Sequence, residues 1–426
     1  MAVSPTAIRG QVVTETTTRA RVLGILFLLF AGAILLLFGL GSESGLKTTF
    51  QLNQTGTGNT ALRLPDLVIP SRGTALFLSA ICAFLAGVQL TRGFGRRTNL
   101  ILGIVVFAFV FAFLTWAARD NSLNLLGMLQ STLLRSVPIT FGALSGVLCE
   151  RSGVINIAIE GMLLSAAFTG SVVGSATHSL WMGLIGGAIV GGLLGAFLAL
   201  LSIRYVVNQI IAGTVINIFA LGITGFLSAR ILEQYQNLNN PGRFEPVAIP
   251  LLSKIPLLGP VLFDENVFVY IMFVLIVAIY LGLFETRWGL RVRAVGEHPR
   301  AADTVGIKVL YTRYRNVILG GMVAGIGGAY FTLGSVGRFD ENMTAGRGFI
   351  GLAAMIFGRW NPVGAFLAAL VFGFADSLQT KLSILQVPIP SEFLQMAPYL
   401  VTIFVVAGVV RKARPPAADG QPYIKE

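Results

Sequence analysis

The strongest constraint on this sequence is a series of long apolar runs, most of them close to twenty residues in length. A helix of about twenty apolar residues spans the hydrocarbon core of a bilayer. Apolar residues make up 54% of the chain and charged residues only 12%, a balance typical of membrane proteins. We therefore predict an all-α polytopic membrane protein with about 10–12 transmembrane helices, some of them broken or re-entrant.

The apolar runs also suggest how the chain is divided. Residues 1–120 are expected to form an N-terminal extension with about three transmembrane helices, residues 121–411 the main membrane core, and residues 412–426 a polar cytoplasmic tail. The predicted crossings, in chain order, are Val22–Leu40, Thr74–Leu90, Leu100–Trp116, Ser131–Leu148, Ala158–Val173, Leu180–Leu201, Gln209–Ile231, Val267–Phe284, Asn316–Leu333, Phe349–Phe357, Val363–Thr380 and Leu394–Val410.

The charge distribution predicts the orientation of these crossings. The formal net charge is +12, and the excess of Lys and Arg lies in short segments on one predicted side of the membrane. Cytoplasmic loops carry such an excess, so both termini are expected in the cytoplasm. Because the positive charge is explained in this way, we do not expect the chain to bind nucleic acid.

Two segments differ from ordinary crossings. Residues 149–161 interrupt apolar sequence with charged residues and glycines, and Phe349–Phe357 is only about half as long as a bilayer-spanning helix. Short apolar segments interrupted by glycine, one in each half of a chain, indicate broken or re-entrant helices beside a transport path.

Polar residues in these segments have two interpretations. Ser152, Asn156 and Glu160 have i, i+4 spacing and would form one stripe on a helix. The stripe, together with Asn217 and Phe349, could line a translocation path near the middle of the membrane. Alternatively, Glu160 accepts hydrogen bonds from backbone amides of the broken helix or pairs with Arg151. Asn217 could equally join two helices.

A basic segment, Arg287–Arg315, separates two apolar runs on the predicted cytoplasmic side. Within it, residues 297–306 are expected to form one short helix, because Pro299 suits a first helical turn and Gly306 suits a helix end. Ala301, Ala302 and Val305 are expected to share one face that fits the groove of a partner. The segment is therefore a candidate connector to a soluble partner.

The sequence contains no pattern for catalysis or for metal binding. Its glycine-rich strings lie inside apolar runs and lack the Lys-Ser/Thr ending of a nucleotide-binding loop. Cys82 and Cys149 lie in or beside apolar runs, and His178 and His298 are far apart in the sequence. We therefore expect a chain that is not an enzyme, has no catalytic or metal site and binds no cofactor.

Several ordered motifs resemble one family. They are SGVINIAIEGMLL (152–164), NQIIAGTVINIFALG (208–222), GLRVRAVGEHPRAADTVG (289–306) and GRGFIGLAAMIFGRWNPVGAFLAALVFG (346–373). In these motifs the chain, from about residue 125 to residue 411, resembles the inner-membrane permeases of bacterial ABC importers for branched-chain amino acids, simple sugars and nucleosides. The string GVINIAIEGM is most similar to that of the nucleoside and simple-sugar subgroup.

The resemblance implies a permease that moves nucleosides or related simple sugars across the bacterial cytoplasmic membrane and lies among its lipids. The implied partners are a second homologous permease, giving a heterodimer, a cytoplasmic ATPase that uses ATP, and an extracytoplasmic substrate-binding lipoprotein. The short helix would be the coupling helix that docks on the ATPase. The residues assigned to it are Glu297, His298, Pro299, Arg300, Ala301, Ala302, Asp303 and Gly306.

One alternative remains at this stage. An ion-gradient-driven secondary transporter would use Glu160 and Asp376 as ion-coupling carboxylates, but it would not need a coupling helix.

The charge distribution leads to a topology prediction. Single cysteines at residues 96, 204, 293 and 411 should be protected from an impermeant thiol reagent, and cysteines at 59, 239 and 340 should react from outside. The measurement is labelling of intact cells in a background without Cys82 and Cys149. Labelling of residue 293 from outside would contradict the predicted orientation.

Overall fold

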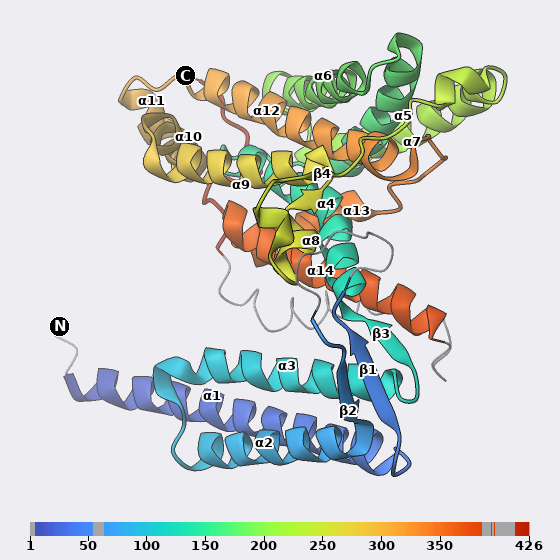
Figure 1. Cartoon of the computed structure of the whole chain (residues 1–426). Coiled ribbons are helices and arrows are strands. Elements are labelled where there is room, and N and C mark those ends of the chain that lie inside the picture. The colour runs from blue at the N-terminus through green and yellow to red at the C-terminus, as the bar shows by residue number, and fades with distance from the viewer. Residues whose placement is uncertain (1–4, 54–63, 386–392, 394–395, 397–413, 426) are drawn as a thin grey trace. The chain divides into compact units, whose positions relative to one another are not determined.

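The computed structural model describes residues 5–53, 64–385, 393, 396 and 414–425. The chain forms two compact units, one of residues 1–127 with 381–389 and the other of residues 128–380 with 390–426. In the described part of the chain, ten helices are long and apolar enough to span a bilayer. This confirms the predicted helical, polytopic membrane protein (Figure 1).

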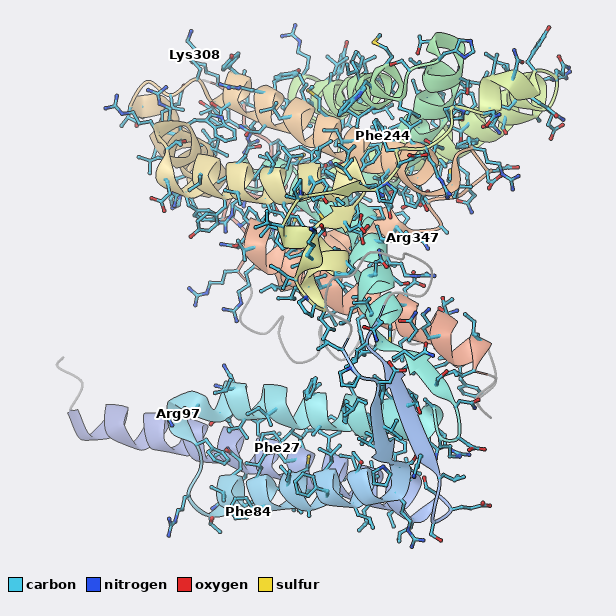
Figure 2. The ribbon with its side chains drawn as sticks, in the orientation of Figure 1. Phe27, Phe84, Arg97, Phe244, Lys308 and Arg347 are labelled. Atoms are coloured by element: carbon cyan, nitrogen blue, oxygen red, sulfur yellow. The ribbon has the colours of Figure 1, made fainter. Side chains whose placement is uncertain are left out.

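The first unit is a three-helix layer with a small sheet. Its helices run alongside one another (Figure 1) and are α1 (Pro5–Ala33, continued by the π-helical residues Ile34–Leu40), α2 (Ser71–Thr91) and α3 (Thr98–Ala117, after the 3-10 turn Gly95–Arg97). Phe27 is buried between them, whereas Phe84 is 71% exposed (Figure 2). Strand β1 (Lys47–Gln51) pairs antiparallel with β2 (Leu67–Pro70) and parallel with β3 (Ser122–Asn124).

The second unit contains the remaining helices. Those of membrane-spanning length are α4 (Leu125–Glu150), α5 (Ile159–Thr177), α6 (Leu180–Ala199, extended to Arg204), α7 (Gln209–Leu227, extended to Leu232), α9 (Val267–Glu285), α12 (Val309–Ala329, extended to Val336) and α14 (Pro362–Ile384). The short ones are α8 (Leu258–Leu262), α10 (Arg287–Glu297), α11 (Pro299–Thr304), α13 (Arg347–Phe357) and the 3-10 turns Gln236–Asn239 and Leu252–Lys254. The largest apolar cluster joins α4, α9, α12, α13 and α14.

Short strands also occur where the sequence predicts only loops. Besides the three strands of the first unit, β4 (Val247–Ala248) pairs with β5 (Asp264–Glu265) in the second. The loop that carries β4 packs against α6 and α9, because the ring of Phe244 makes edge-to-face contacts with Trp181 and Phe268 (Figure 2). These strands were not predicted because each is five residues or fewer and lacks a long alternating pattern.

Close packing of α6 against α12 explains the glycine-rich sequences. A methyl group added at Gly191 would lie 2.3 Å from the carbonyl oxygen of Gly321 and 2.6 Å from Cα of Gly325. The two backbones therefore touch, and only small residues permit this approach.

Residues 149–161 form a break between two helices. Helix α4 ends at Glu150, Gly153 has φ of +85°, and α5 begins only at Ile159. Ser152 and Asn156 consequently lie outside any helix, so the predicted helical stripe through Glu160 is wrong. Positive φ at Gly153 and the non-helical residues 154–158 after it separate side chains that i, i+4 spacing on one helix would align.

Two of the predicted crossings do not correspond to a long helix in the described part of the chain. The half-length segment Phe349–Phe357 is the short helix α13, which does not span a bilayer by itself. The last predicted crossing, Leu394–Val410, lies outside the described residues except for Met396.

The α6–α12 contact leads to a stability prediction. Gly191→Leu should destabilise the membrane bundle by about 3 kcal/mol or more, because the added atoms would push against backbone rather than flexible side chains. Gly222→Leu on α7 is the matched control, since nothing lies within 4 Å of its added methyl group. Thermal unfolding in detergent measures the difference. Equal melting temperatures would contradict the backbone contact.

Candidate translocation path and coupling surface

Glu160 stands at the start of α5 and binds the segment that precedes and begins α13. Its Oε1 accepts hydrogen bonds from the Thr344 hydroxyl (2.6 Å) and the Gly346 amide (2.8 Å), and its Oε2 accepts one from the Gly348 amide (2.6 Å). A carboxylate is favoured at the positive N-terminal end of a helix. Of the two interpretations offered by the sequence, these contacts match the one in which Glu160 binds backbone amides of a broken helix.

Asn217 of α7 binds the irregular segment that precedes α5 and the first turn of α5. Its Nδ2 donates to the Ile157 carbonyl (2.8 Å), and its Oδ1 accepts from the Gly161 amide (2.8 Å). The side chain thus joins α7 to the chain entering α5. The structure therefore places Glu160, Asn217 and the start of α13 close together.

The other two residues of the predicted stripe are fully buried. Nδ2 of Asn156 donates to the Ser145 hydroxyl (3.3 Å), whereas its Oδ1 has no hydrogen-bond partner. The Ser152 hydroxyl donates to the Cys149 carbonyl. Both side chains lie between α4 and the irregular segment that follows it. Phe349 differs, because it is 50% exposed on α13.

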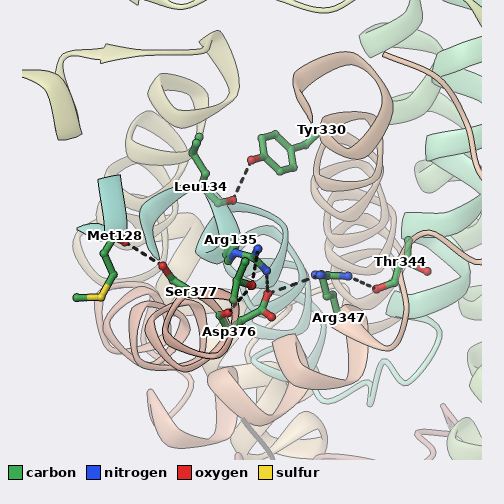
Figure 3. A network of polar contacts seen from close by, with 9 residues as sticks. Met128, Leu134, Arg135, Tyr330, Thr344, Arg347, Asp376 and Ser377 are labelled. Atoms are coloured by element: carbon green, nitrogen blue, oxygen red, sulfur yellow. Dashed lines mark hydrogen bonds and ion pairs between the residues drawn. The ribbon is translucent and has the colours of Figure 1, made fainter. Parts of the chain in front are cut away.

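A charged network lies beside these residues (Figure 3). Asp376 of α14 pairs with Arg135 of α4 at 2.6 Å and with Arg347 of α13 at 3.6 Å. Arg347 also donates to the Thr344 carbonyl (3.4 Å), which connects the network to Glu160. The three charged side chains remain 23–31% exposed. Partly exposed charges inside a membrane bundle require water or protein beside them, because lipid would not solvate them.

Helix α13 crosses the unit only together with the irregular segment before it. Near one end of the unit, Asn239 accepts a hydrogen bond from the Phe339 amide (2.7 Å). After α13, the Trp360 carbonyl accepts one from Arg151 (2.9 Å), beyond the C-terminal end of α4. A helix of 11 residues is about 16 Å long. The irregular segment 337–346 supplies the rest of the distance. Phe339 and Thr344 anchor it in the protein because both are buried, whereas most of its other residues are exposed.

We call the end of the second unit that holds Arg151, Gly296 and Trp360 the coupling end. Helices α10 and α11 meet there, Pro299 lies at the first turn of α11, and Gly306 ends it with φ of +82°. The predicted single helix is thus split at His298. Exposed residues on α11 and its flanks are Glu297, His298, Arg300, Ala301, Thr304, Val305 and Gly306.

Ala302 does not share the outward face that the sequence predicted for it. It is only 3% exposed and packs against Val295 and Val309, whereas Val305 is 74% exposed. The six-residue helix turns one side toward its own chain, because a short helix gains stability by burying its apolar face. The outward apolar face is therefore formed by Ala301 and Val305.

Carboxyl groups also meet at the coupling end. Glu150 accepts a hydrogen bond from the Trp360 indole and forms another with Asp419 of the C-terminal tail. Burial is the main cause that raises the pKa of Asp419 to about 6. On the opposite side of the unit, burial raises the pKa of Glu265 to about 8.

The sequence interpretation missed the Arg135–Asp376–Arg347 network. The signal was present, since Arg135 and Asp376 each interrupt a predicted apolar crossing, and intramembrane charges are usually paired. The sequence alone does not show that the helices that carry them, α4 and α14, are neighbours. Among the described residues, no group of three or more His, Cys, Asp or Glu could hold a metal ion.

Comparison with known proteins identifies the class. Residues 128–406 match the family described as branched-chain amino acid transport system, permease component. The chain belongs to this permease family. Family membership agrees with the prediction that the chain is a permease component and not itself an enzyme. No solved structure matches the chain.

Two relatives cover most of the chain. It is 39% identical over 318 residues to the nucleoside ABC transporter permease protein NupC of Lactococcus lactis subsp. cremoris, covering 72% of this chain and 99% of that protein. It is 38% identical over 309 residues to the guanosine ABC transporter permease protein NupQ of Bacillus subtilis, covering 70% and 96%. A putative glucose ABC transporter permease protein of Haloferax volcanii, TsgC13, is 32% identical over 60% of this chain and 77% of its own length.

The contacts of Glu160 lead to a prediction that separates structure from transport. Glu160→Gln should lower the free energy of unfolding by about 2–3 kcal/mol, because the amide group would face a backbone donor and leave it without an acceptor. Thermal unfolding measures this, with the exposed Glu233→Gln as control. If Glu160→Gln melts like the parent protein but abolishes uptake, the carboxylate acts in the path instead of holding the break.

Proposed function

We propose that this chain is the transmembrane permease subunit of an ABC importer that carries nucleosides or related simple sugars. The single observation that carries the proposal is the exposed face of α11 at the coupling end, where Ala301 is exposed and Val305 is 74% exposed. In a permease whose relatives NupC and NupQ belong to ABC transporters of nucleosides and guanosine, this face suits docking on an ATPase.

The proposed assembly contains three further proteins. A second homologous permease forms a heterodimer with this chain, a cytoplasmic ATPase hydrolyses ATP, and an extracytoplasmic lipoprotein delivers the substrate. The chain binds no cofactor of its own and no nucleic acid. It lies among the lipids of the bacterial cytoplasmic membrane with both termini in the cytoplasm, as its charge distribution favours.

The proposed path runs along the partly exposed side of α13. Phe349 offers an aromatic face that could stack on a base, and the Arg135–Asp376–Arg347 network offers donors and acceptors for sugar hydroxyl groups. Behind this side, the irregular segments before α5 and α13 are held in place by hydrogen bonds of Glu160, Asn217, Asn156 and Ser152. Residues 1–120 are proposed as an extension to a transport core of residues 121–411.

Uptake by the reconstituted complex tests the proposal. Proteoliposomes containing this chain, its partner permease and the ATPase, supplied with the binding lipoprotein, should accumulate labelled guanosine only when ATP is available to the ATPase. Ionophores that abolish ion gradients should leave the rate unchanged. Uptake that requires an ion gradient but not ATP would favour a secondary transporter and contradict the proposal.

A matched pair of variants tests the docking face. Ala301→Arg should weaken co-purification of the ATPase at least about tenfold without lowering the melting temperature, because the residue is exposed. Ala248→Arg, at an exposed alanine of β4, should have no effect. Ala302→Arg should also lower the melting temperature, since Ala302 is buried. Normal ATPase recovery with Ala301→Arg would contradict the assignment of α11 as the coupling helix.

A further inference from the structure

The C-terminal tail, residues 414–425, lies on the coupling end. It follows the region matched by the permease family, which ends at residue 406. The Ala418 amide donates to the Gly296 carbonyl (2.9 Å), and the Ala417 amide donates to Oε2 of Glu297 (3.1 Å). The C-terminus accordingly lies beside α11 and α12 (Figure 1). Both contacts are made just before α11 begins.

The tail also covers a buried arginine. Arg313 of α12 is only 2% exposed, and its Nη1 donates to the Gln421 carbonyl of the tail (2.8 Å). Asp419 provides opposite charge nearby. Removing a guanidinium group from water is costly unless it is paired and hydrogen-bonded. The tail supplies one hydrogen bond and a nearby carboxylate, which favour its position against the membrane unit, whereas Nε and Nη2 of Arg313 have no hydrogen-bond partner.

The last residues of the tail extend the surface of α11. Tyr423 packs against the apolar cluster of Val295, Ala302 and Val309, and Lys425 pairs with Asp303 at 3.6 Å. Ile424 is nevertheless 71% exposed. A cavity of about 270 Å³ lies between the tail and the loop that joins α6 to α7. Gly420 and Pro422 line it from the tail, and Val206, Val207 and Asn208 line it from the loop.

We propose that the tail, α11 and the loop between α6 and α7 form one composite docking surface for the ATPase. This inference rests on the proposed function and names further elements of the same interface. Ile424 and Val305 are the exposed apolar contacts, and the cavity beside Pro422 accepts a projecting side chain of the partner. Five Lys and Arg of this region are exposed, so the facing surface of the ATPase carries acidic residues around an apolar centre. They are Arg287, Arg291, Arg300, Lys308 and Arg315.

The argument for one partner is the continuity of these elements. The tail binds both to the residues before α11 and, through Lys425, to α11 itself. A protein that docks on Ala301 and Val305 therefore meets the tail as well. The apolar side chain of Ile424 is 71% exposed and becomes covered when a partner docks on this surface.

The test uses the full chain assembled with its partner permease. Ile424→Glu should weaken ATPase binding about tenfold and leave the melting temperature unchanged. Val247→Glu, at a 54% exposed valine of β4, is the matched control and should bind like the parent. Parent-like binding by Ile424→Glu, combined with lost binding by Ala301→Arg, would overturn the composite surface but leave the proposed function intact. Parent-like binding by both variants would instead reject the proposed docking on α11.

A cross-linking experiment gives an independent measurement. In a chain without Cys82 and Cys149, a photoactivatable thiol probe is attached after Ile424→Cys or Ala301→Cys. Both positions should cross-link to the ATPase, and a probe after Val247→Cys should not. Cross-linking from Ala301→Cys alone would overturn the role of the tail, even if Ile424→Glu proved unstable.

Discussion

Three hydrogen bonds to one carboxylate hold the irregular part of this membrane bundle together. Glu160 accepts them from Thr344, Gly346 and Gly348. Unpaired backbone amides are costly in the interior of a membrane, and broken helices survive only where protein satisfies them. The carboxylate does this for the start of α13 while it stands at the start of α5. Its position therefore fixes the two breaks relative to each other.

A continuous set of contacts leads from these breaks to the coupling end. Helix α13 ends at Phe357, and the Trp360 carbonyl that follows binds Arg151. The Trp360 indole binds Glu150, whose carboxyl group meets Asp419 of the tail. The tail in turn binds Gly296, three residues before the start of α11. Displacement of α11 by an ATPase would thus act on packed and hydrogen-bonded elements that reach the proposed path.

Much of this fold follows from the sequence, because bilayer thickness sets the length of apolar helices. Ten of the predicted crossings correspond to long helices and an eleventh, Phe349–Phe357, to a short one, and Pro299 and Gly306 bound α11 as expected. The stripe through Ser152 and Asn156 failed because spacing alone does not show where a helix ends. Which face of α11 is buried, and which helix neighbours Asp376, depend on tertiary packing that no local pattern contains.

The most direct measurement is hydrogen exchange at the amides of residues 344–350 in lipid nanodiscs. The Gly346 and Gly348 amides donate to the half-buried carboxylate of Glu160. Hydrogen-bonded amides of this kind exchange only when the local structure opens. The account predicts that this irregular segment is protected as strongly as the interior of α4 and that Glu160→Gln removes the protection. Rapid exchange in the parent protein, or protection that survives Glu160→Gln, would contradict the role assigned to Glu160.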